Sequence, residues 1–486
     1  MYEAVTQDVD ESPPGPGCIA FFDFDGTLLF GYSIFALTLE RVLAGQLAPG
    51  EAITRFLEML ALRVAGSEFP ELLAEAAAPL AGVDEQLFID LGTAVFDKYL
   101  AAAIYPESRA LVTAHLRRGH RVVILSSATS YQVAAVADEL GVRDVVCNRL
   151  GVRNGRFTGK LHQPLCYGAG KLKAAKKLAK RCDVPLDDCY FYSDGYEDLP
   201  LLEAVGFPRP TNPDRLLEAE AKRRQWPVRR FASRGVPGIR ELVRTGLVYG
   251  AFFSAALQIV PTWMLNRSRR AAVNLAVSTW GEYGSALAGI DIHINGEQHL
   301  WSTRPAVFLF NHQSAIDVLI IARLLRRDFT AIAKQEIARN PLVGPVFRVA
   351  DTVFVDRSNH AKALEALMPV VDALRDGLSV AIAPEGTRSA GRRLGPFKKG
   401  PFHIAMQAGV SVVPVVIHNA ADVLPKGGFF IRPAEVYVDV LPPVETASWS
   451  AATVDRHVAD VRKLFLEKLG QGIASPGSMP VSAPDP

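Results

Sequence analysis

The sequence predicts two α/β domains joined by an apolar helical segment. Helix and strand signals alternate over residues 18–215, and a second alternating series begins at Asp291. Alternation of this kind favours a parallel sheet covered by helices. A long apolar stretch, residues 246–290, separates the two series. The length of 486 residues fits this division, since it provides for two or three domains.

The composition is that of a globular protein, with 49% hydrophobic and 21% charged residues. The net charge of +2 is too small for a polyelectrolyte binder, so we expect no nucleic-acid partner. The cysteines form no CxxC pair, which favours free thiols in a reducing compartment over disulfides or a zinc site. There are five of them: Cys18, Cys147, Cys166, Cys182 and Cys189. The sequence does not indicate an oligomeric state.

Both ends of the chain are predicted to be disordered. Residues 1–17 are acidic and then rich in Pro and Gly, without the apolar core of a secretory signal, and residues 471–486 are rich in Pro, Ser and Gly. Residues 18–215 form the first predicted domain, with a helical insertion over about 31–105. Its strands are expected at Ile19–Phe22, Arg121–Leu125 and Cys189–Tyr192, and its helices at Tyr131–Leu140 and Lys171–Lys180.

A basic linker, residues 216–245, leads into two apolar segments, Leu247–Leu265 and Ala271–Ile290. Two buried helices of a soluble core would show the same pattern. The basic flanks favour membrane association, as two spans, a shallow hairpin or two helices lying on the cytoplasmic face. Each basic residue near an anionic membrane surface contributes on the order of 1 kcal/mol. We therefore expect a membrane-associated protein whose catalytic domains face the cytoplasm.

The second predicted domain covers residues 291–470. Helices are expected near residues 317–327 and 360–376. The expected strands are Ala306–Phe310, Val353–Val355, Val380–Ala383, Val412–Ile417 and Val436–Leu441.

Acidic residues follow two strands of the first domain. Asp23 and Asp25 come after an apolar strand, so their carboxylates are expected at the ligand-binding edge of the sheet. One carboxylate can attack phosphorus while the other protonates the leaving oxygen. Asp194 and Asp198 again follow a strand and offer hard oxygen ligands for Mg²⁺. The predicted metal set is Asp23, Asp25, Asp194 and Asp198.

Two further residues are suited to binding a phosphoryl group. Ser126 comes at the end of the strand that contains Val122–Leu125, and Lys171 adds positive charge at the start of a helix. Ser127 is an alternative to Ser126. The order DxDGT, strand-Ser, Lys and acidic loop resembles the haloacid dehalogenase superfamily, with the helical cap of its phosphoserine-phosphatase-like branch. The resemblance implies a Rossmann-like domain, Mg²⁺ as cofactor, Asp23 as nucleophile and Asp25 as acid/base.

One position departs from that branch. Its members carry an acidic residue shortly after the DxD motif, which holds the substrate ammonium, whereas this chain has Tyr32. Without that charge we do not expect selectivity for an amino-acid phosphate. The substrate is expected to be a different phosphomonoester.

The second domain carries a His and an Asp in the run Asn311-His312-Gln313-Ser314-Ala315-Ile316-Asp317, where a strand enters a helix. Acyl transfer to a hydroxyl needs a base, and histidine has a suitable pKa. A carboxylate that fixes the imidazole completes the pair, so Asp317 is expected to fold back onto His312. No serine nucleophile is needed if the acceptor hydroxyl attacks directly.

Several cations follow strands of the same domain. Arg357 and Arg388 end two strand motifs, and arginine suits phosphate because of its planar fork. Lys334 and the Lys398-Lys399 pair add positive charge nearby.

The blocks NHQSAID, FVDR, PEGTRS and VVPVVI, in that order, resemble the glycerophospholipid acyltransferases over about residues 290–445. Within that family the chain is most similar to the 1-acylglycerol-3-phosphate acyltransferases. The resemblance implies that His312 and Asp317 are catalytic and that Pro414 shapes the acyl-donor side. It also implies that Arg357, Glu385, Gly386 and Arg388 bind the glycerol phosphate.

The sequence therefore predicts a bifunctional lipid enzyme. Its second half would acylate a lysophospholipid from acyl-CoA or acyl-carrier protein, giving phosphatidic acid, and its first half would hydrolyse a phosphomonoester. Two alternatives remain open. The first half could be a non-catalytic or regulatory domain, or the chain could be an amino-acid phosphate phosphatase with a lipid-anchoring half.

Overall fold

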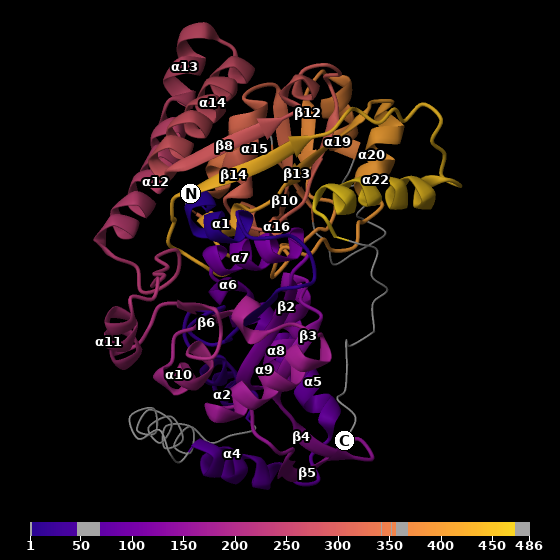
Figure 1. The fold of residues 1–486 in the computed structure, drawn as a ribbon. Helices are drawn as coiled ribbons and strands as arrows, with labels where there is room; N and C mark the ends of the chain where they lie inside the picture. Colours follow the sequence, from indigo (N-terminus) through magenta and orange to yellow (C-terminus); the bar gives the residue numbers. More distant parts are fainter. Residues whose placement is uncertain (1, 46–68, 342, 351, 356–367, 472–486) are drawn as a thin grey trace. The chain divides into compact units, whose positions relative to one another are not determined.

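The computed structural model describes residues 2–45, 69–341, 343–350, 352–355 and 368–471. The chain divides into two compact units, Met1–Val236 and Pro237–Pro476. Each unit is an α/β structure built on its own sheet (Figure 1). The predicted α/β fold class is confirmed.

A five-stranded parallel sheet of order β3-β2-β1-β6-β7 forms the first unit. Its strands are β1 Ile19–Phe22, β2 Arg121–Thr129, β3 Asp144–Asn148, β6 Tyr190–Ser193 and β7 Phe207–Pro210. The flanking helices are α7 Pro106–Arg117, α8 Ser130–Leu140, α9 Ala169–Arg181, α10 Leu199–Leu202 and α11 Arg215–Arg224. Val122 and Ile124 enter one hydrophobic core while Val123 and Leu125 enter another, so both faces of the sheet are buried.

The cap of the first unit contains helices and a β-hairpin. Its helical elements are α2 Ser33–Leu43, α4 Phe69–Ala77, η1 Ala78–Leu80, α5 Glu85–Val95, η2 Phe96–Leu100 and α6 Ala101–Ala103. The hairpin of β4 Leu150–Arg153 and β5 Arg156–Leu161 lies outside the predicted insertion. It packs on the cap through Phe157, whose ring contacts Phe88 at a centroid distance of 5.0 Å.

The expectation of disorder at the amino terminus is wrong for residues 3–10, which form helix α1 Glu3–Asp10. Val9 is fully buried in the core that α7 also lines. Asp8 forms ion pairs with Arg209 (2.9 Å) and Arg229 (2.6 Å). The helix is held by these contacts at a distance in sequence, which the local composition does not reveal.

A seven-stranded sheet of order β11-β10-β12-β9-β13-β14-β8 forms the second unit. The strands from β11 to β13 in this order are mutually parallel, while β14 runs antiparallel to β13. Strands are β8 Ile290–Asn295, β9 Val307–Phe310, β10 Phe329–Lys334, β11 Val353–Val355, β12 Ser379–Ile382, β13 Val412–Ile417 and β14 Ala434–Val440. Strands β8 and β10 had not been predicted.

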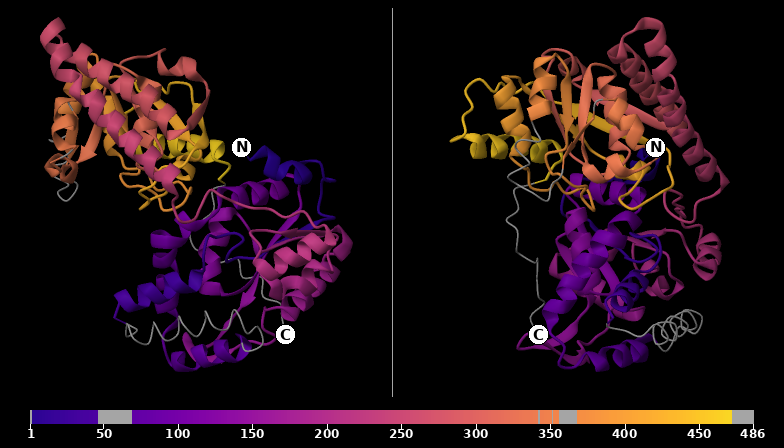
Figure 2. Two further views of the ribbon diagram at one scale, coloured as in Figure 1. Left: turned by 90° about the vertical axis from the view of Figure 1, so that its left-hand side faces the viewer. Right: turned by 180° about the vertical axis from the view of Figure 1, so that it is seen from behind.

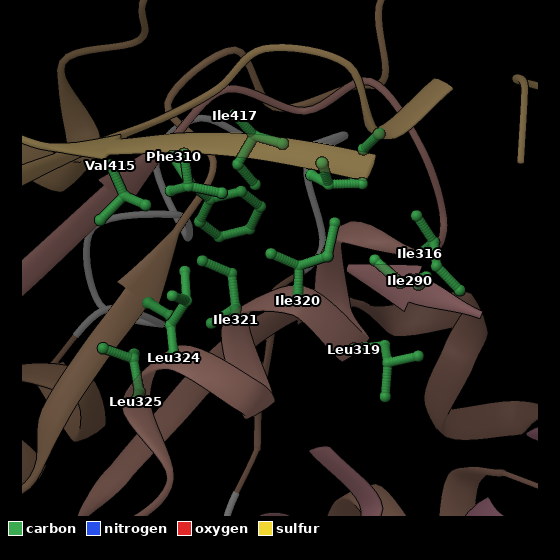
Figure 3. Close-up of a cluster of buried hydrophobic side chains, with 14 of the residues drawn as sticks. Ile290, Phe310, Ile316, Leu319, Ile320, Ile321, Leu324, Leu325, Val415 and Ile417 are labelled. Atoms are coloured by element: carbon green, nitrogen blue, oxygen red, sulfur yellow. The ribbon is translucent and has the colours of Figure 1, made fainter. Parts of the chain in front are cut away.

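Helices cover both faces of this sheet (Figure 2). They are η5 Glu297–Leu300, α15 Asp317–Leu325, α16 Gln335–Arg339, α17 Gly344–Val349, α19 Met368–Arg375, α20 Gly400–Ala408, α21 Ala420–Val423 and α22 Val454–Lys468. Figure 3 shows Ile320, Ile321 and Leu324 of α15 pointing toward Phe310 and Val415 of the sheet. This packing fixes α15, and with it Asp317 at its first position.

Two long helices precede the sheet, and their environments differ. Helix α12 Ile239–Leu257 continues into α13 Ile259–Asn266, and α14 Arg269–Ala288 returns alongside α12. The stretch Ile239–Asn266 is long and apolar enough to cross a membrane, and 17% of its most apolar window is buried. Large apolar side chains are exposed on it, including Leu257, Met264 and Leu265.

Helix α14, the second apolar segment, instead packs against α15. A Cβ at Gly281 would lie 2.8 Å from the Cα of Arg323, and one at Gly284 would lie 2.7 Å from Leu319 Cδ1. These two glycines let the helices approach closely. Of the two predicted membrane segments, α12–α13 exposes the more extensive series of large apolar side chains, while α14 exposes Leu275, Tyr283 and Leu287.

The basic linker also differs from the expectation, because part of it is helix α11 and many of its cations are ion-paired. The pairs are Lys222–Glu218, Arg223–Glu220, Arg224–Glu220, Arg229–Asp8 and Arg230–Glu218. Within the described part of the chain, Arg240 and Arg244 on α12 form no salt bridge. The cationic flank of the apolar helix is therefore smaller than the sequence indicates.

Candidate active sites

Asp23 and Asp194 lie at the carboxyl edge of the first sheet, as predicted. Asp23 follows β1, Asp194 follows the neighbouring β6, and the Asp23 N–H donates to the Tyr192 carbonyl at 2.9 Å. An ideal Cβ at Gly26 would lie 2.1 Å from Asp194 Oδ2, and Gly26 has a φ of +75°. Glycine is therefore required there, and the Asp194 carboxylate lies directly against the loop that follows Asp25.

Lys171 bridges two buried carboxylates of this site. Its Nζ lies 2.7 Å from Asp23 Oδ1 and 2.7 Å from Asp198 Oδ2, and Ser193 Oγ donates to the same Asp198 oxygen at 2.6 Å. Burial acts to lower the pKa of Lys171, but Asp198 and Asp23 outweigh it and hold that pKa well above its usual value. Burial raises the pKa of Asp23 against the opposing charge of Lys171.

The Asp25 carboxylate is held by the first residue of the cap helix. The Ser33 N–H donates to Asp25 Oδ1 at 2.7 Å, and Ser33 Oγ donates to Asp25 Oδ2 at 3.1 Å. Gln132 Nε2 in turn donates to Ser33 Oγ at 2.9 Å. Burial raises the pKa of Asp25 to about 7, so this carboxyl can carry a proton near neutral pH. Ser33 and Gln132 were not singled out from the sequence, because neither belongs to a charged motif.

Ser126 lies inside β2, not after it, and is almost fully buried. Its Oγ accepts a hydrogen bond from the Ala128 N–H at 3.0 Å, while Ser127 is half-buried. Tyr32 occupies the position directly before Ser33, at the start of α2. The structure thus places an aromatic residue, with no charge, beside the residue that holds Asp25.

The predicted metal set is only partly assembled. Among the described residues, no three His, Cys, Asp or Glu side chains are arranged to hold a metal ion, and Lys171 lies between Asp23 and Asp198. The donors nevertheless fit a hard divalent cation in kind, since all are carboxylate oxygens. Asp198 Oδ1 is buried and has no hydrogen-bond partner in the described structure. Acidic side chains outnumber the single Lys171 at this site, and a bound cation would offset the charge of those that are ionised.

In the second unit, His312 and Asp317 form the predicted pair. His312 follows β9, and its Nδ1 lies 2.8 Å from Asp317 Oδ2. The same carboxylate oxygen accepts the backbone N–H groups of Gln313 and Ser314, both at 2.9 Å. Asp317 is fully buried, whereas 23% of the His312 side chain is exposed. Asp317 therefore fixes the proton on Nδ1 and leaves Nε2 as the available base.

Neighbouring polar side chains hold this turn against the sheet. Asn311 exchanges two hydrogen bonds with the backbone of Ile417, at 2.7 and 2.8 Å. Gln313 Nε2 donates to the Ile417 carbonyl at 3.1 Å, and Ser314 Oγ donates to the Leu424 carbonyl at 2.5 Å. These positioning roles were missed, because hydrogen bonds to β13 and beyond are not visible in a local motif.

Glu385 contacts the His312 turn and not an exposed cation. Its Oε1 accepts the His312 N–H and its Oε2 accepts the Gly395 N–H, both at 2.8 Å. The side chain is buried, and burial raises the pKa of Glu385. Since both oxygens are occupied by backbone donors, the arrangement supports a positioning role instead of the predicted phosphate contact.

Two cationic residues, Arg388 and Lys398, lie in the loop that follows Glu385. The Ser389 N–H donates to the His312 carbonyl at 2.9 Å, so the half-exposed Arg388 is next to the His312 turn. Within the described residues Arg388 and Lys398 form no salt bridge. A Cβ at Gly386, whose φ is +75°, would lie 2.9 Å from Lys398 Nζ. Gly386 thus gives the lysine room against the backbone.

The remaining predicted residues are placed less completely. Lys334 is the last residue of β10, whose carboxyl end lies at the same sheet edge as that of β9. Pro414 is buried inside β13. Arg357 lies outside the described residues.

The residue types at these two sites are those that a phosphoryl hydrolase and an acyltransferase would use. A family model described as haloacid dehalogenase-like hydrolase matches residues 20–203, and one described as acyltransferase matches residues 291–418. The chain belongs to the haloacid dehalogenase-like hydrolases through its first unit and to the 1-acyl-sn-glycerol-3-phosphate acyltransferase family through its second.

Three relatives illustrate the match. A 1-acyl-sn-glycerol-3-phosphate acyltransferase from Limnanthes alba is 34% identical over 38% of this chain and 65% of its own length. The protein of that name from Cocos nucifera is 33% identical over 43% of this chain and 68% of its own length. A probable phosphatase from Mycobacterium tuberculosis is 31% identical over 44% of this chain and 75% of its own length. The chain thus spans just under two thirds of the Limnanthes relative.

Proposed function

We propose that the second unit transfers an acyl group from acyl-CoA or acyl-carrier protein to the free hydroxyl of 1-acylglycerol-3-phosphate, giving phosphatidic acid. The His312–Asp317 pair carries this proposal. His312 Nε2 takes the proton of the acceptor hydroxyl while the hydroxyl oxygen attacks the thioester carbonyl. Asp317, 2.8 Å from Nδ1, stabilises the imidazolium that forms. The imidazolium then returns the proton to the leaving thiolate.

The phosphate of the acceptor would be bound by the cations around the turn. Arg388 is half-exposed beside the His312 turn, and Lys398 is exposed on the same loop. Arg357 and Lys334 complete the proposed set. Glu385 would act by holding the His312 backbone and the loop in register.

Acceptor and donor can be tested together. Purified protein is incubated with 1-acylglycerol-3-phosphate or glycerol 3-phosphate, each with acyl-CoA or acyl-carrier protein. The lipid products are identified by mass spectrometry. We expect phosphatidic acid from the first acceptor with at least one donor. Acylation of glycerol 3-phosphate alone would contradict the proposed acceptor.

We propose that the first unit hydrolyses a phosphomonoester, with Asp23 as nucleophile and Asp25 as acid. Asp23 would attack phosphorus, and Asp25 would protonate the leaving oxygen, which leaves an aspartyl-phosphate. Water would then attack this phosphorus, giving up a proton to Asp25, so that phosphate leaves and Asp23 is restored. Lys171 orients Asp23 through the 2.7 Å contact and adds positive charge for the phosphoryl oxygens. Mg²⁺, held by Asp23, Asp194 and Asp198, would supply charge neutralisation when bound. Ser33 would hold the Asp25 carboxylate in place through both of its oxygens.

The phosphatase substrate is proposed to be a lipid phosphate of the same reaction sequence. Tyr32 replaces the acidic residue that an amino-acid phosphate requires, and the other half of the chain handles a phosphorylated glycerolipid. Hydrolysis of phosphatidic acid would yield diacylglycerol. If the wild-type protein with Mg²⁺ accumulates phosphatidic acid and forms no diacylglycerol, the coupling is wrong.

A second candidate makes the first unit a non-catalytic ligand sensor. Turnover of a generic phosphomonoester, lost in Asp23→Asn, would exclude it. The buried Lys171 bridge and the burial that raises the pKa of Asp25 favour catalysis.

Membrane association on the cytoplasmic side is proposed for the second unit. The exposed apolar face of α12–α13 is flanked by Arg240 and Arg244 at its start and by the exposed Arg267 after its end, which suits an anionic lipid surface. A substrate with a long acyl chain resides in such a surface.

A further inference from the structure

The loop between α21 and β14 presents an aromatic residue to solvent on a fixed base. We call residues 425–432 the Phe429 loop. Phe429 is 59% exposed at its tip, next to Gly427 and Gly428, which are also exposed. Ile431 at its base is buried, and its N–H donates to Thr245 Oγ1 of α12 at 2.9 Å. The exposure of Phe429 is therefore a property of an ordered loop.

The tip of this loop continues the exposed apolar face of α12. The Phe429 ring stacks on Tyr249 at a centroid distance of 6.0 Å and an interplanar angle of 22°. Tyr249 is itself 45% exposed, and the exposed Phe253 follows one turn later. Loop and helix thus form one exposed apolar surface, and surfaces of this kind mark contacts with a membrane or a partner.

Cations surround this surface. Lys426 lies in the loop, and Arg240 and Arg244 lie on the first turns of α12, with no salt bridge from any of the three to a described residue. Glu241 is the acidic side chain among them, and it caps the Gly238 N–H at 2.9 Å. An apolar surface bordered by basic side chains matches the interface of an anionic bilayer.

The loop is also tied to the active-site turn. Ser314 Oγ donates to the carbonyl of Leu424, the residue before the loop, at 2.5 Å. The Ser314 N–H donates to Asp317 Oδ2 at 2.9 Å. A contact that fixes the position of the Phe429 loop therefore also helps to position the His312 turn.

We infer that the Phe429 loop is a second membrane contact, which inserts Phe429 into the headgroup region of an anionic bilayer beside α12–α13. The inference rests on the proposed membrane association and adds to it a contact close to the catalytic pair. Two contacts fix the orientation of the sheet edge, so that an acceptor still embedded in the bilayer reaches His312.

The test compares Phe429→Ser with Tyr437→Ser in the full chain. Tyr437 is a matched control, being an aromatic residue of the same unit, 45% exposed, in strand β14. Binding to vesicles of phosphatidylcholine with phosphatidylglycerol is measured by sedimentation. We expect Phe429→Ser to weaken binding about tenfold, as for one buried aromatic side chain. Phe429→Leu should restore most of it, and Tyr437→Ser should bind as wild type.

Acylation assays on two acceptors distinguish a lipid contact of Phe429 from a structural role of that residue. Phe429→Ser should lose about tenfold on long-chain acceptor in vesicles and retain wild-type activity on a short-chain acceptor in solution. Equal loss on both acceptors, or unchanged vesicle binding, would overturn the inference. Conversion of an oligomer to a monomer by Phe429→Ser would assign the surface to a second copy of the chain and overturn it too.

A direct readout does not depend on activity. In Phe429→Trp, brominated phospholipids should quench more fluorescence than in Tyr437→Trp, and equal quenching contradicts insertion. If wild-type protein binds no vesicles, the proposed membrane association fails as a whole. If it binds vesicles but forms no phosphatidic acid, the proposed activity fails while the binding and quenching results still decide the role of the loop.

Discussion

One carboxylate oxygen of Asp317 contacts both the His312 imidazole and the backbone of the turn that joins the two residues. Asp317 Oδ2 lies 2.8 Å from His312 Nδ1 and accepts two backbone N–H groups from the residues between them. A single buried carboxylate thus shapes the turn, fixes the imidazole tautomer and supplies the negative charge that an imidazolium needs.

Asp317→Asn separates the charge from the shape. The amide oxygen can accept the same N–H groups while the amide nitrogen replaces Oδ1, which is buried without a hydrogen-bond partner in the described structure. We expect acyl transfer to fall by about 10³-fold because the imidazolium loses its counter-charge. Thermal unfolding should change little. Activity within tenfold of wild type, at an unchanged unfolding temperature, would remove Asp317 from the mechanism.

Glu385→Gln tests the positioning role of Glu385. The glutamine amide nitrogen would face a backbone N–H, so either the His312 or the Gly395 contact is lost. We expect stability to fall by about 1–3 kcal/mol. We also expect kcat to fall while KM for the lysophospholipid is nearly unchanged.

Arg388→Gln is the matched control for Glu385→Gln, because Arg388 lies in the same loop and is proposed to bind phosphate. It should mainly raise KM for the lysophospholipid. The opposite pattern, with KM raised by Glu385→Gln and kcat lowered by Arg388→Gln, would return Glu385 to the phosphate site.

Lys171→Met tests the buried bridge in the first unit. Its removal leaves Asp23 and Asp198 without their shared cation, and breaking a buried pair costs about 3–5 kcal/mol. We expect loss of phosphatase activity and a denaturant midpoint that recovers partly when Mg²⁺ is added. Lys173→Met, on the exposed face of the same helix, should behave as wild type. Wild-type stability of Lys171→Met would show that the bridge contributes nothing.

His115 predicts an acid-sensitive first unit. It is fully buried, with Nδ1 2.8 Å from His120 Nδ1 and Nε2 3.0 Å from the Tyr192 hydroxyl, and burial lowers the pKa of His115 to about 3. Between that value and the ordinary 6.5, the unfolded chain binds one proton more than the folded chain. Stability should therefore fall as pH falls, by about 2 kcal/mol from pH 6.5 to pH 5.

The non-titrating variant His115→Gln isolates this effect. Denaturant unfolding at both pH values should show a smaller acid loss in the variant than in the wild type. Equal losses would mean that His115 is not the group responsible.

The location of the site residues can be predicted well from the sequence. Acidic and basic residues that follow apolar strands lie at the same edge of the sheet in any parallel α/β unit. Helix α1 and the roles of Glu385, Ser33 and Gln132 could not be predicted, since they depend on contacts far away in sequence. The strand β8 has an alternating signal, Ile290, Ile292 and Ile294, which its position after an apolar helix obscured. The hairpin β4–β5 lacks a strong apolar run and packs on the cap through Phe157 and Leu150.

The basic linker illustrates the opposite limit. Counting its arginines predicts a broad cationic flank, but acidic residues such as Glu218, Glu220 and Asp8 neutralise much of it. Charge pairing depends on which side chains the fold brings together, and composition does not contain that information.

The central claim is that the chain carries two separate catalytic sites. The most direct test compares His312→Ala with Asp23→Asn, using mass spectrometry of the lipids formed from 1-acylglycerol-3-phosphate and an acyl donor, alongside hydrolysis of a generic phosphomonoester. His312→Ala should abolish phosphatidic acid formation and leave hydrolysis intact, and Asp23→Asn should do the reverse. Loss of both activities in either variant, with the fold retained, would contradict the claim.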